Sequence, residues 1–325
     1  MTQAPYSIPN IPGKQRILVA PLNWGLGHAT RCIPIIEKLI SDGHDVIIAA
    51  DGYPLALLQE AFPRVKTISF PSFSIHYSKA RFQIGHLLLR LPKILLGIWK
   101  EHRKLQIYIG QYRINYVISD NRFGLWSRLI PSVYITHQLM IKMPKSLRLF
   151  EPLAWAIHRV IISRYSECWI PDKPDKNSLS GDLAHKYPLP KNARFIGHLS
   201  RFSGAPTIIP TETYHTVVLV SGPEPQRSLF EKEWTLKLHD RKAAVLIVQG
   251  LPQQEILKKQ IDTICFVSHL PTAILKAQLL AAKKIICRSG YSSIMDMHTI
   301  NKKAAYYPTP GQTEQEYLAT LHNGK

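Results

Sequence analysis

Residues 23–28 near the start of the chain read NWGLGH. Two glycines flank a leucine there, and a histidine follows the second glycine. The stretch follows an apolar run and precedes a helical pattern, so His28 is expected at the first turn of a helix. The positive end of a helix dipole disfavours an imidazolium and leaves a neutral ring that can take a proton. We therefore predict that His28 is the base for a reacting hydroxyl. The alternative is that His28 only caps the helix.

The same stretch also allows a dinucleotide-binding interpretation. Gly25 and Gly27 match the first two positions of a GxGxxG fingerprint, and Asp51 follows the next strand, where a ribose-binding carboxylate would stand. Thr30 occupies the third glycine position, and a partial fingerprint of this kind is weak evidence.

A second candidate site lies in residues 287–297 (CRSGYSSIMDM), which are expected to end a strand and open a helix. Backbone amides at a helix start bind anions, serine hydroxyls add donors, and an arginine supplies a fixed charge for a phosphate. An aspartate one turn into the helix suits a ribose diol. The predicted donor-binding residues here are Arg288, Ser289, Gly290, Ser292, Ser293 and Asp296.

Another helix start follows one strand later, in residues 308–319 (PTPGQTEQEYLA). Gln315 and Glu316 are expected to point toward the same site, where amide and carboxylate groups bind sugar hydroxyls. Two neighbouring helix starts could thus hold a diphosphate, a ribose and a sugar.

The run from residue 288 to residue 319 resembles the donor-binding region of family 28 glycosyltransferases. That family includes the peptidoglycan enzyme that adds N-acetylglucosamine to an undecaprenyl-linked intermediate, and the diacylglycerol glycosyltransferases. Residues 25–31 (GLGHATR) resemble the N-terminal glycine–histidine loop of these enzymes. The resemblance implies a GT-B fold, with the nucleotide-sugar donor held by the C-terminal domain and the acceptor by the N-terminal one.

The resemblance also implies further roles, residue by residue. It matches His28 to the proposed base, Asp296 to an acidic ribose ligand that is usually Glu, and Gln315 with Glu316 to a glutamine pair on the donor sugar. Residues 197–201 (GHLSR) resemble the segment whose arginine approaches the diphosphate. Residues 265–270 (CFVSHL) resemble the strand end whose backbone reads the base. These last two matches nominate Arg201 and Val267.

Two features depart from that pattern. In the family, the first loop of the C-terminal domain is rich in glycine and serine and cradles phosphate. Here that loop is SGPEPQR (221–227), in which two prolines remove amide donors and leave Gly222 as a weaker candidate for donor binding. The sequence also ends soon after the second helix start, so one expectation is a C-terminal domain without the final helices that return to the N-terminal domain.

The acceptor side is predicted from residues at strand ends and near His28. Asp120 and Arg122 follow one strand, and His137 ends another, where it could orient the acceptor or serve only as a rim histidine. The predicted acceptor-side residues are Gly25, Gly27, Arg31, Asp120 and His137.

The expected reaction is attack of an acceptor hydroxyl on the anomeric carbon of a UDP-linked hexose or N-acetylhexosamine, with inversion. A base takes the hydroxyl proton, and positive charge stabilises the departing diphosphate. The sequence has no DxD motif, and Asp172 and Asp175 are expected in a turn, so a transferase without metal or cofactor is predicted. The alternatives are a nucleotide-sugar epimerase of the same fold and a non-catalytic nucleotide-sugar-binding or membrane-associated subunit.

Apolar runs separated by helical patterns must position these residues. Runs of this kind predict parallel sheets that are covered on both faces. We expect two doubly wound, Rossmann-like domains facing across a cleft, over residues 14–200 and 201–325, after a flexible tail at 1–13. The predicted strands are residues 16–22, 44–51, 65–71, 115–120, 132–138 and 167–172, then 216–222, 243–250, 263–268, 284–290 and 303–311.

The charge of the chain favours anionic partners. It has 325 residues and a formal net charge of +19. Residues 86–110 and 145–165 combine apolar and basic side chains, which suits an acidic membrane surface or ordinary amphipathic helices. Pro92 and Gly97 are expected to interrupt any continuous apolar face in the first segment, which favours the ordinary helix there. Scattered basic residues do not predict nucleic-acid binding. Four unpaired cysteines and no signal peptide predict a cytoplasmic protein, with peripheral contact at the inner face of the plasma membrane and a lipid-linked acceptor as further expectations.

Overall fold

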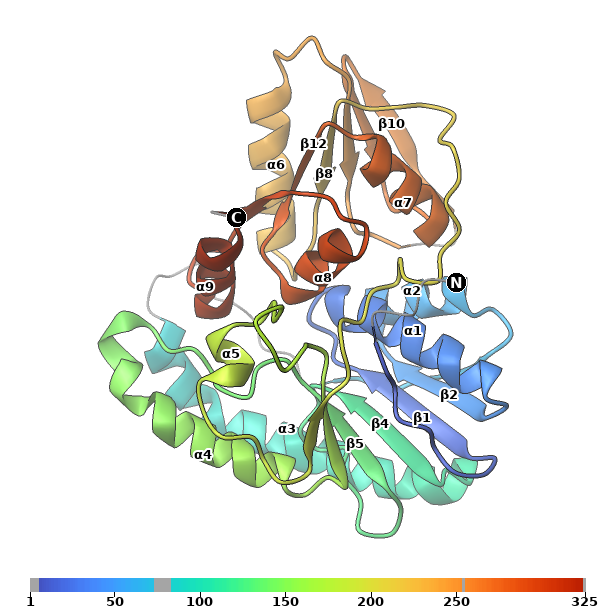
Figure 1. Ribbon diagram of the computed structural model, residues 1–325, viewed down its shortest axis with the longest axis vertical. Coiled ribbons are helices and arrows are strands. Elements are labelled where there is room, and N and C mark those ends of the chain that lie inside the picture. The colour runs from blue at the N-terminus through green and yellow to red at the C-terminus, as the bar shows by residue number, and fades with distance from the viewer. Residues whose placement is uncertain (1–5, 73–82, 253–254, 324–325) are drawn as a thin grey trace.

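Two sheets of mainly parallel strands form the cores of two α/β domains in the computed structural model, which describes residues 6–72, 83–252 and 255–323 (Figure 1). The N-terminal sheet has the order β3-β2-β1-β4-β5-β6-β7, and all of its described pairings are parallel. Its strands are β1 (Arg16–Pro21), β2 (Asp45–Ala50), β3 (Lys66–Ser69), β4 (Tyr116–Asp120), β5 (Ser132–Ile135), β6 (Glu167–Ile170) and β7 (Ala193–Phe195).

Helices cover this sheet because its strands are apolar on both faces. In α1, apolar residues recur at intervals of three and four, and Ala29, Cys32, Ile33 and Ile36 are buried. The helices of this domain are α1 (Gly27–Ser41), α2 (Gly52–Ala61), α3 (Gln83–Tyr112), the 3-10 helix η1 (Lys145–Phe150), α4 (Glu151–Ile162) and α5 (Asp182–His185).

The C-terminal sheet has the order β10-β11-β9-β8-β12-β13, with β10 antiparallel to β11 at one edge. Its strands are β8 (Thr216–Leu219), β9 (Val245–Val248), β10 (Lys258–Ile261), β11 (Ile264–Val267), β12 (Lys284–Arg288) and β13 (Ala305–Tyr307). The helices are α6 (Gln226–Leu238), α7 (Thr272–Ala281), α8 (Tyr291–Thr299) and α9 (Thr313–His322). The two doubly wound domains predicted from the apolar runs are therefore confirmed.

The connection between the sheets runs from β7 to β8, and the predicted boundary between residues 200 and 201 lies within it. Residues 193–195, which are not among the predicted strands, form β7 at the edge of the N-terminal sheet.

Residues 6–13 pack on the N-terminal domain, so the prediction of a flexible tail is wrong for them. Tyr6 forms an antiparallel bridge with Gly197, and Ile8 and Ile11 are buried. Burial of two isoleucine side chains accounts for the ordering of this segment. Residues 1–5 of the predicted tail lie outside the described residues.

Helix α3 runs without a break through Pro92 and Gly97, the two residues that were expected to interrupt its apolar face. A proline removes one backbone hydrogen bond but does not forbid a helix that packing supports elsewhere, as at the buried Leu105. Across the described ranges, no helix is long and apolar enough to cross a bilayer.

Candidate active site

The loop from β1 to α1 brings His28 to the boundary between the two domains. Gly25 has a φ of +77°, in the left-handed region that favours glycine. A Cβ on Gly25 would lie 3.1 Å from the Cα of Gly222, so this loop and the loop after β8 approach backbone to backbone. His28 then occupies the first turn of α1, as predicted, and its side chain is 13% exposed.

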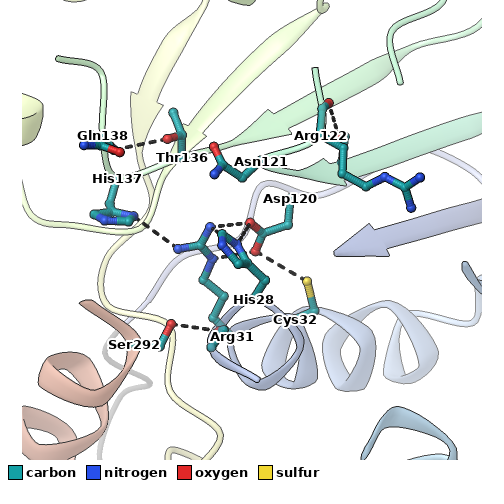
Figure 2. Close-up of polar contacts among 12 residues, drawn as sticks. His28, Arg31, Cys32, Asp120, Asn121, Arg122, Thr136, His137, Gln138 and Ser292 are labelled. Atoms are coloured by element: carbon teal, nitrogen blue, oxygen red, sulfur yellow. Dashed lines mark hydrogen bonds and ion pairs between the residues drawn. The ribbon is translucent and has the colours of Figure 1, made fainter. Parts of the chain in front are cut away.

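Asp120, at the end of β4, lies directly against His28. Its Oδ1 is 2.8 Å from Nδ1 of the imidazole. Arg31, one turn after His28, donates from Nε and Nη2 to the two oxygens of the same carboxylate (Figure 2). Asp120 is fully buried and Arg31 is 2% exposed. The site therefore holds a buried ion pair, and the His28 imidazole lies beside it.

Burial and the neighbouring charges determine the protonation states of Asp120 and His28. Burial alone would raise the pKa of Asp120, but Arg31 and His28 hold that pKa well below its usual range. Burial and the Arg31 charge lower the pKa of His28, and they outweigh the opposing effect of Asp120. An ionised carboxylate thus faces a neutral imidazole.

His137 continues the polar chain toward the C-terminal domain. Its Nδ1 accepts from Nη1 of Arg31 at 3.2 Å, and its Nε2 lies 2.8 Å from Oε1 of Glu314 at the start of α9. Burial alone would raise the pKa of Glu314, but the nearby His137 lowers it. His137 is therefore a contact between the domains, which neither of its predicted roles included.

The start of α8 meets the start of α1. The Ser292 hydroxyl donates to the carbonyl of Gly27 at 2.7 Å, and a Cβ on Gly27 would lie 3.0 Å from that hydroxyl oxygen. The ring of Tyr291 stacks on His137 with centroids 4.1 Å apart. The predicted donor loop and the predicted base are therefore brought together.

Arg288 does not face this site as predicted. It is 5% exposed, donates to the carbonyls of Pro308 and Gln226 at 2.8 and 3.3 Å, and lies over the ring of Phe230. Burial lowers its pKa to about 10. The two terminal nitrogens of the guanidinium that was expected to bind phosphate thus donate to carbonyls of the loop after β13 and of the first residue of α6.

Arg201 and Asp296 are paired with each other, although each was predicted to contact the donor. Nε of Arg201 lies 3.7 Å from Oδ2 of Asp296, whose Oδ1 accepts from the Ser200 hydroxyl at 2.6 Å. Burial raises the pKa of Asp296 to about 6. The pair joins the interdomain connection to α8, so neither side chain is presented to a ribose or a diphosphate.

Gln315 and Glu316 close the loop between β13 and α9 instead of pointing to the site. Oε1 of Gln315 accepts from the amide of Thr309 at 2.8 Å, and Oε1 of Glu316 accepts from the amide of Gly311 at 3.1 Å. The Ser289 hydroxyl donates to the Gln315 carbonyl at 2.8 Å, so this predicted donor residue also has a structural contact.

The backbone of Val267 is used within its sheet. Its carbonyl accepts from the amide of Gln249 at 2.9 Å, and the residue pairs with Lys258 and Val248. The strand expected to read a base is therefore not at the edge of the sheet, since β10, which the sequence did not reveal, pairs beside it.

The remaining predicted donor residues lie around the start of α8 and the loop after β8. Gly290 is the residue before α8, and a Cβ built on it would meet nothing within 4 Å. Ser293 lies in the first turn of the same helix, and Gly222 has a φ of +109°. Gly290 and Ser293 thus lie at a helix start, as the sequence predicted, and their role in binding a donor stays a prediction.

Two other side chains have structural roles. Arg122 points away from His28 (Figure 2) and pairs with buried Glu101 at 2.9 Å. Asp51 accepts from the side chains of Asn23 and Ser72, which fixes the β1–α1 loop and does not suggest a ribose site.

Across residues 6–72, 83–252 and 255–323, no group of three His, Cys, Asp or Glu side chains is arranged to hold a metal ion. Asp172 accepts from the amides of Leu179 and Ser180 at 2.9 and 3.0 Å, in keeping with the predicted turn.

Sequence reasoning missed Glu314 and the direct contact between Asp120 and His28. Glu314 is the first acid of the QTEQE run, and consecutive helical residues point about 100° apart, so a shift of one position moves a side chain out of the site. The spacing of His28 and Arg31 by three residues on one helix was a usable signal, because such residues share a face.

Two curated relatives are similar to the chain over most of its length. An uncharacterized glycosyltransferase of Methanosarcina acetivorans is 21% identical, over 94% of this chain and 83% of the relative. Another uncharacterized glycosyltransferase, of Methanosarcina mazei, is 23% identical over the same shares of the two chains. No family model matches the chain.

Several solved glycosyltransferase structures share this fold. The glycosyltransferase of kitacinnamycin has a TM-score of 0.60 and 14% identity, covering 96% of this chain and 85% of that one. An Arabidopsis thaliana enzyme complexed with UDP-L-rhamnose has a TM-score of 0.56 and 13% identity, over 94% and 82%. Spinosyn rhamnosyltransferase complexed with thymidine diphosphate has a TM-score of 0.54 and 14% identity, over 94% and 84%. The chain therefore has the GT-B fold, and the comparisons support glycosyltransferase activity.

Proposed function

We propose that this glycosyltransferase moves a sugar from a nucleoside diphosphate sugar to a hydroxyl of a lipid-linked acceptor, with inversion and without a metal, as in the family 28 enzymes it resembles. One observation carries the proposal: the imidazole of His28, held by Asp120, lies where the start of α1 touches the start of α8. A base and an anion-binding helix start therefore meet between the two domains.

The proposed step balances around His28. Its Nε2 takes the proton of the acceptor hydroxyl while the acceptor oxygen forms a bond to the anomeric carbon. The bond from that carbon to the diphosphate oxygen breaks, and the nucleoside diphosphate leaves with the electron pair. Amides at the start of α8, around Gly290, would stabilise the charge that develops on the leaving group.

The donor class is supported by the fold neighbours, which were crystallised with UDP-L-rhamnose and thymidine diphosphate. We propose a UDP-linked sugar first, with the thymidine-linked class as the competing donor.

The test is transfer and binding in a matched pair of variants. His28→Gln is expected to abolish transfer from UDP-sugars and to leave UDP affinity, measured by calorimetry, within about threefold, because the ring acts on the acceptor. His239→Gln is the control, because that exposed histidine in the other domain touches neither helix start. Undiminished turnover in His28→Gln would remove this residue from the mechanism, and weak UDP binding in the wild type would contradict the donor assignment.

A membrane-surface acceptor is supported by the outer face of η1 and α4. Exposed apolar side chains recur there at helical spacing, and exposed arginines flank them. Such a face suits the interface of an anionic bilayer, since apolar groups insert and cations pair with lipid phosphates. The apolar residues are Leu149, Phe150, Leu153, Ile157 and Val160, and the arginines are Arg148, Arg159 and Arg164.

Vesicle flotation tests the surface directly. The wild type is expected to float with vesicles that contain about a third phosphatidylglycerol and not with pure phosphatidylcholine. The double variant Leu153→Ser/Ile157→Ser is expected to lose flotation, whereas Leu236→Ser, at an exposed leucine of α6, retains it. Equal flotation of the double variant and the wild type would contradict the assignment of this face.

A further inference from the structure

Two groups compete for one nitrogen of His28. Nδ1 of the imidazole lies 2.8 Å from Oδ1 of Asp120 and also 2.8 Å from Nη2 of Arg31. A neutral ring nitrogen either carries a hydrogen and donates, or has a lone pair and accepts. Only one of the two contacts can therefore be a hydrogen bond at a time.

The two alternatives have opposite chemical consequences. If Nδ1–H donates to Asp120, the lone pair is on Nε2, which can accept a proton. If Nδ1 accepts from Arg31, the hydrogen is on Nε2 and the ring cannot act as a base there. The choice between Asp120 and Arg31 thus decides whether His28 can perform the proposed step.

The charges favour donation to Asp120. A hydrogen bond to an ionised carboxylate is about twice as strong as one between neutral groups, and Arg31 already directs Nε and Nη2 to that carboxylate. Because Arg31 balances the charge of Asp120, the ring does not need to be cationic to satisfy it. A cationic ring would also lie against the guanidinium.

Burial and a second hydrogen bond hold the Arg31 guanidinium beside Asp120. It is 2% exposed, and its Nη1 donates to His137, which in turn contacts Glu314 of the C-terminal domain. The charged or titratable groups that contact or face the ring are Asp120 at the end of β4, Arg31 and Cys32 on α1, His137 after β5, and Glu314 on α9.

We propose that Arg31 is a positioning residue that shares Asp120 with His28 and thereby keeps the ring neutral, with its hydrogen on Nδ1 and its lone pair on Nε2. The inference deepens the proposed function and rests on it for its catalytic meaning. The state of the ring itself can be measured without any substrate.

The experiment is nitrogen-15 NMR of histidine-labelled protein, with His28→Gln to identify the His28 signals among the 14 histidines. In the wild type, His28 is expected in the Nδ1–H neutral form from pH 6 to pH 8. In Arg31→Met, the ring is expected to become imidazolium within that range, because Asp120 then has no other cation. Arg31→Lys, which keeps the charge, is expected to restore the neutral ring.

The control is Arg122→Met, which removes a buried arginine that contacts Glu101 and not His28, so a general loss of stability would leave the His28 signals unchanged. If Arg31→Met does not fold, Arg31→Gln, which keeps a hydrogen-bond donor but removes the charge, takes its place, and an imidazolium is again expected. An Nε2–H ring or an imidazolium in the wild type at pH 7, or an unaltered neutral ring in Arg31→Met, would overturn the proposal.

Activity gives a separate readout. The acid limb of the pH profile of kcat/KM is expected to move upward by about one pH unit in Arg31→Met, which a purely structural loss would not do. NMR results as expected without any transferase activity would contradict the proposed function and leave the assignment of the ring state standing.

Discussion

The carboxylate of Asp120 organises the site because Arg31, His28 and Cys32 all direct polar atoms to it. A buried charge of this kind is stable only while it is paired. The catalytic geometry proposed for His28 therefore depends on an ion pair that also stabilises the N-terminal domain.

Replacing Asp120 with Asn tests that dependence. The change leaves Arg31 buried without its counter-ion, so we expect the free energy of unfolding at pH 7 to fall by about 3–5 kcal/mol. The pKa of Asp120 is lowered in the folded state, so its stabilising contribution is present above its usual pKa of about 4 and is lost as the pH falls. Urea unfolding at several pH values should show the deficit shrinking toward acid.

The control is Asp42→Asn at the exposed pair of Asp42 with Lys38, which is expected to cost less than about 1 kcal/mol at any pH. Similar losses in the two variants would show that Asp120 is not the buried anchor described above.

Asp296 has the opposite pH dependence. Burial raises its pKa to about 6, so the folded state holds a proton that the unfolded state has released above pH 4. Its contribution is greatest below the unfolded pKa and is lost as the pH rises through about 6, a change of about 3 kcal/mol in all. We expect Asp296→Asn to flatten the stability curve between pH 4 and pH 6.5, measured by urea unfolding. An unchanged slope would mean that Asp296 is ionised throughout, beside Arg201.

Individual side chains were the least predictable from sequence. The residue types of the helix starts indicated where the site would be, and His28, Asp120, Arg31 and His137 do meet there. What could not be read was direction, since Gln315 and Glu316 close a loop while Glu314 faces the site. Arg288 was misassigned because local spacing does not reveal the carbonyls of distant loops.

At the scale of elements, strands were predictable because each central strand is a continuous apolar run bounded by turn residues. Strand β10 has the exposed sequence KKQI and gave no such signal, because its formation depends on pairing with β11. It pairs Lys258 with Val267, the residue expected to read the base. Edge strands of this type are determined by tertiary contact.

The approach of the loops after β1 and β8 predicts a position-specific effect of added bulk. Gly25→Ala places a Cβ about 3 Å from the backbone of Gly222 at a positive φ, so we expect the loops to separate. Transfer activity should fall at least about tenfold, as expected for a small misplacement of reacting groups, with the protein still folded.

Gly43→Ala is matched to it, because Gly43 also has a positive φ and has no atom within 4 Å of the added Cβ. It is expected to cost about 1 kcal/mol of stability, measured by thermal unfolding, with unchanged kcat/KM. Equal loss of activity in both variants would attribute the effect to backbone strain and not to the contact between loops.

On the scale of the whole molecule, side chains of the C-terminal domain donate to backbone carbonyls of the N-terminal domain. Tyr291 donates to Pro171 at 2.9 Å, Ser292 to Gly27 at 2.7 Å and Thr313 to Lys142 at 2.6 Å. Such contacts depend on how the two domains pack against each other, so no local sequence pattern could predict them. They also explain how α9, at the end of the sequence, comes to lie against the N-terminal domain, where Tyr317 accepts from the amide of Asp182.

These contacts predict that the two domains unfold together. Each interdomain hydrogen bond contributes about 1 kcal/mol, so removing three should weaken the coupling by about 3 kcal/mol. We expect the wild type to show one unfolding transition in urea, and the triple variant Tyr291→Phe/Ser292→Ala/Thr313→Val to show two. At urea concentrations below the first transition, the triple variant is expected to have a larger radius of gyration than the wild type, measured by small-angle X-ray scattering. The control removes three hydroxyls that bond within a helix or at its end, far from the other domain: Ser41→Ala, Ser163→Ala and Thr235→Val. It is expected to lower stability while keeping one transition. A single transition and an unchanged radius in the interdomain variant would mean that apolar packing, and not these hydrogen bonds, couples the domains.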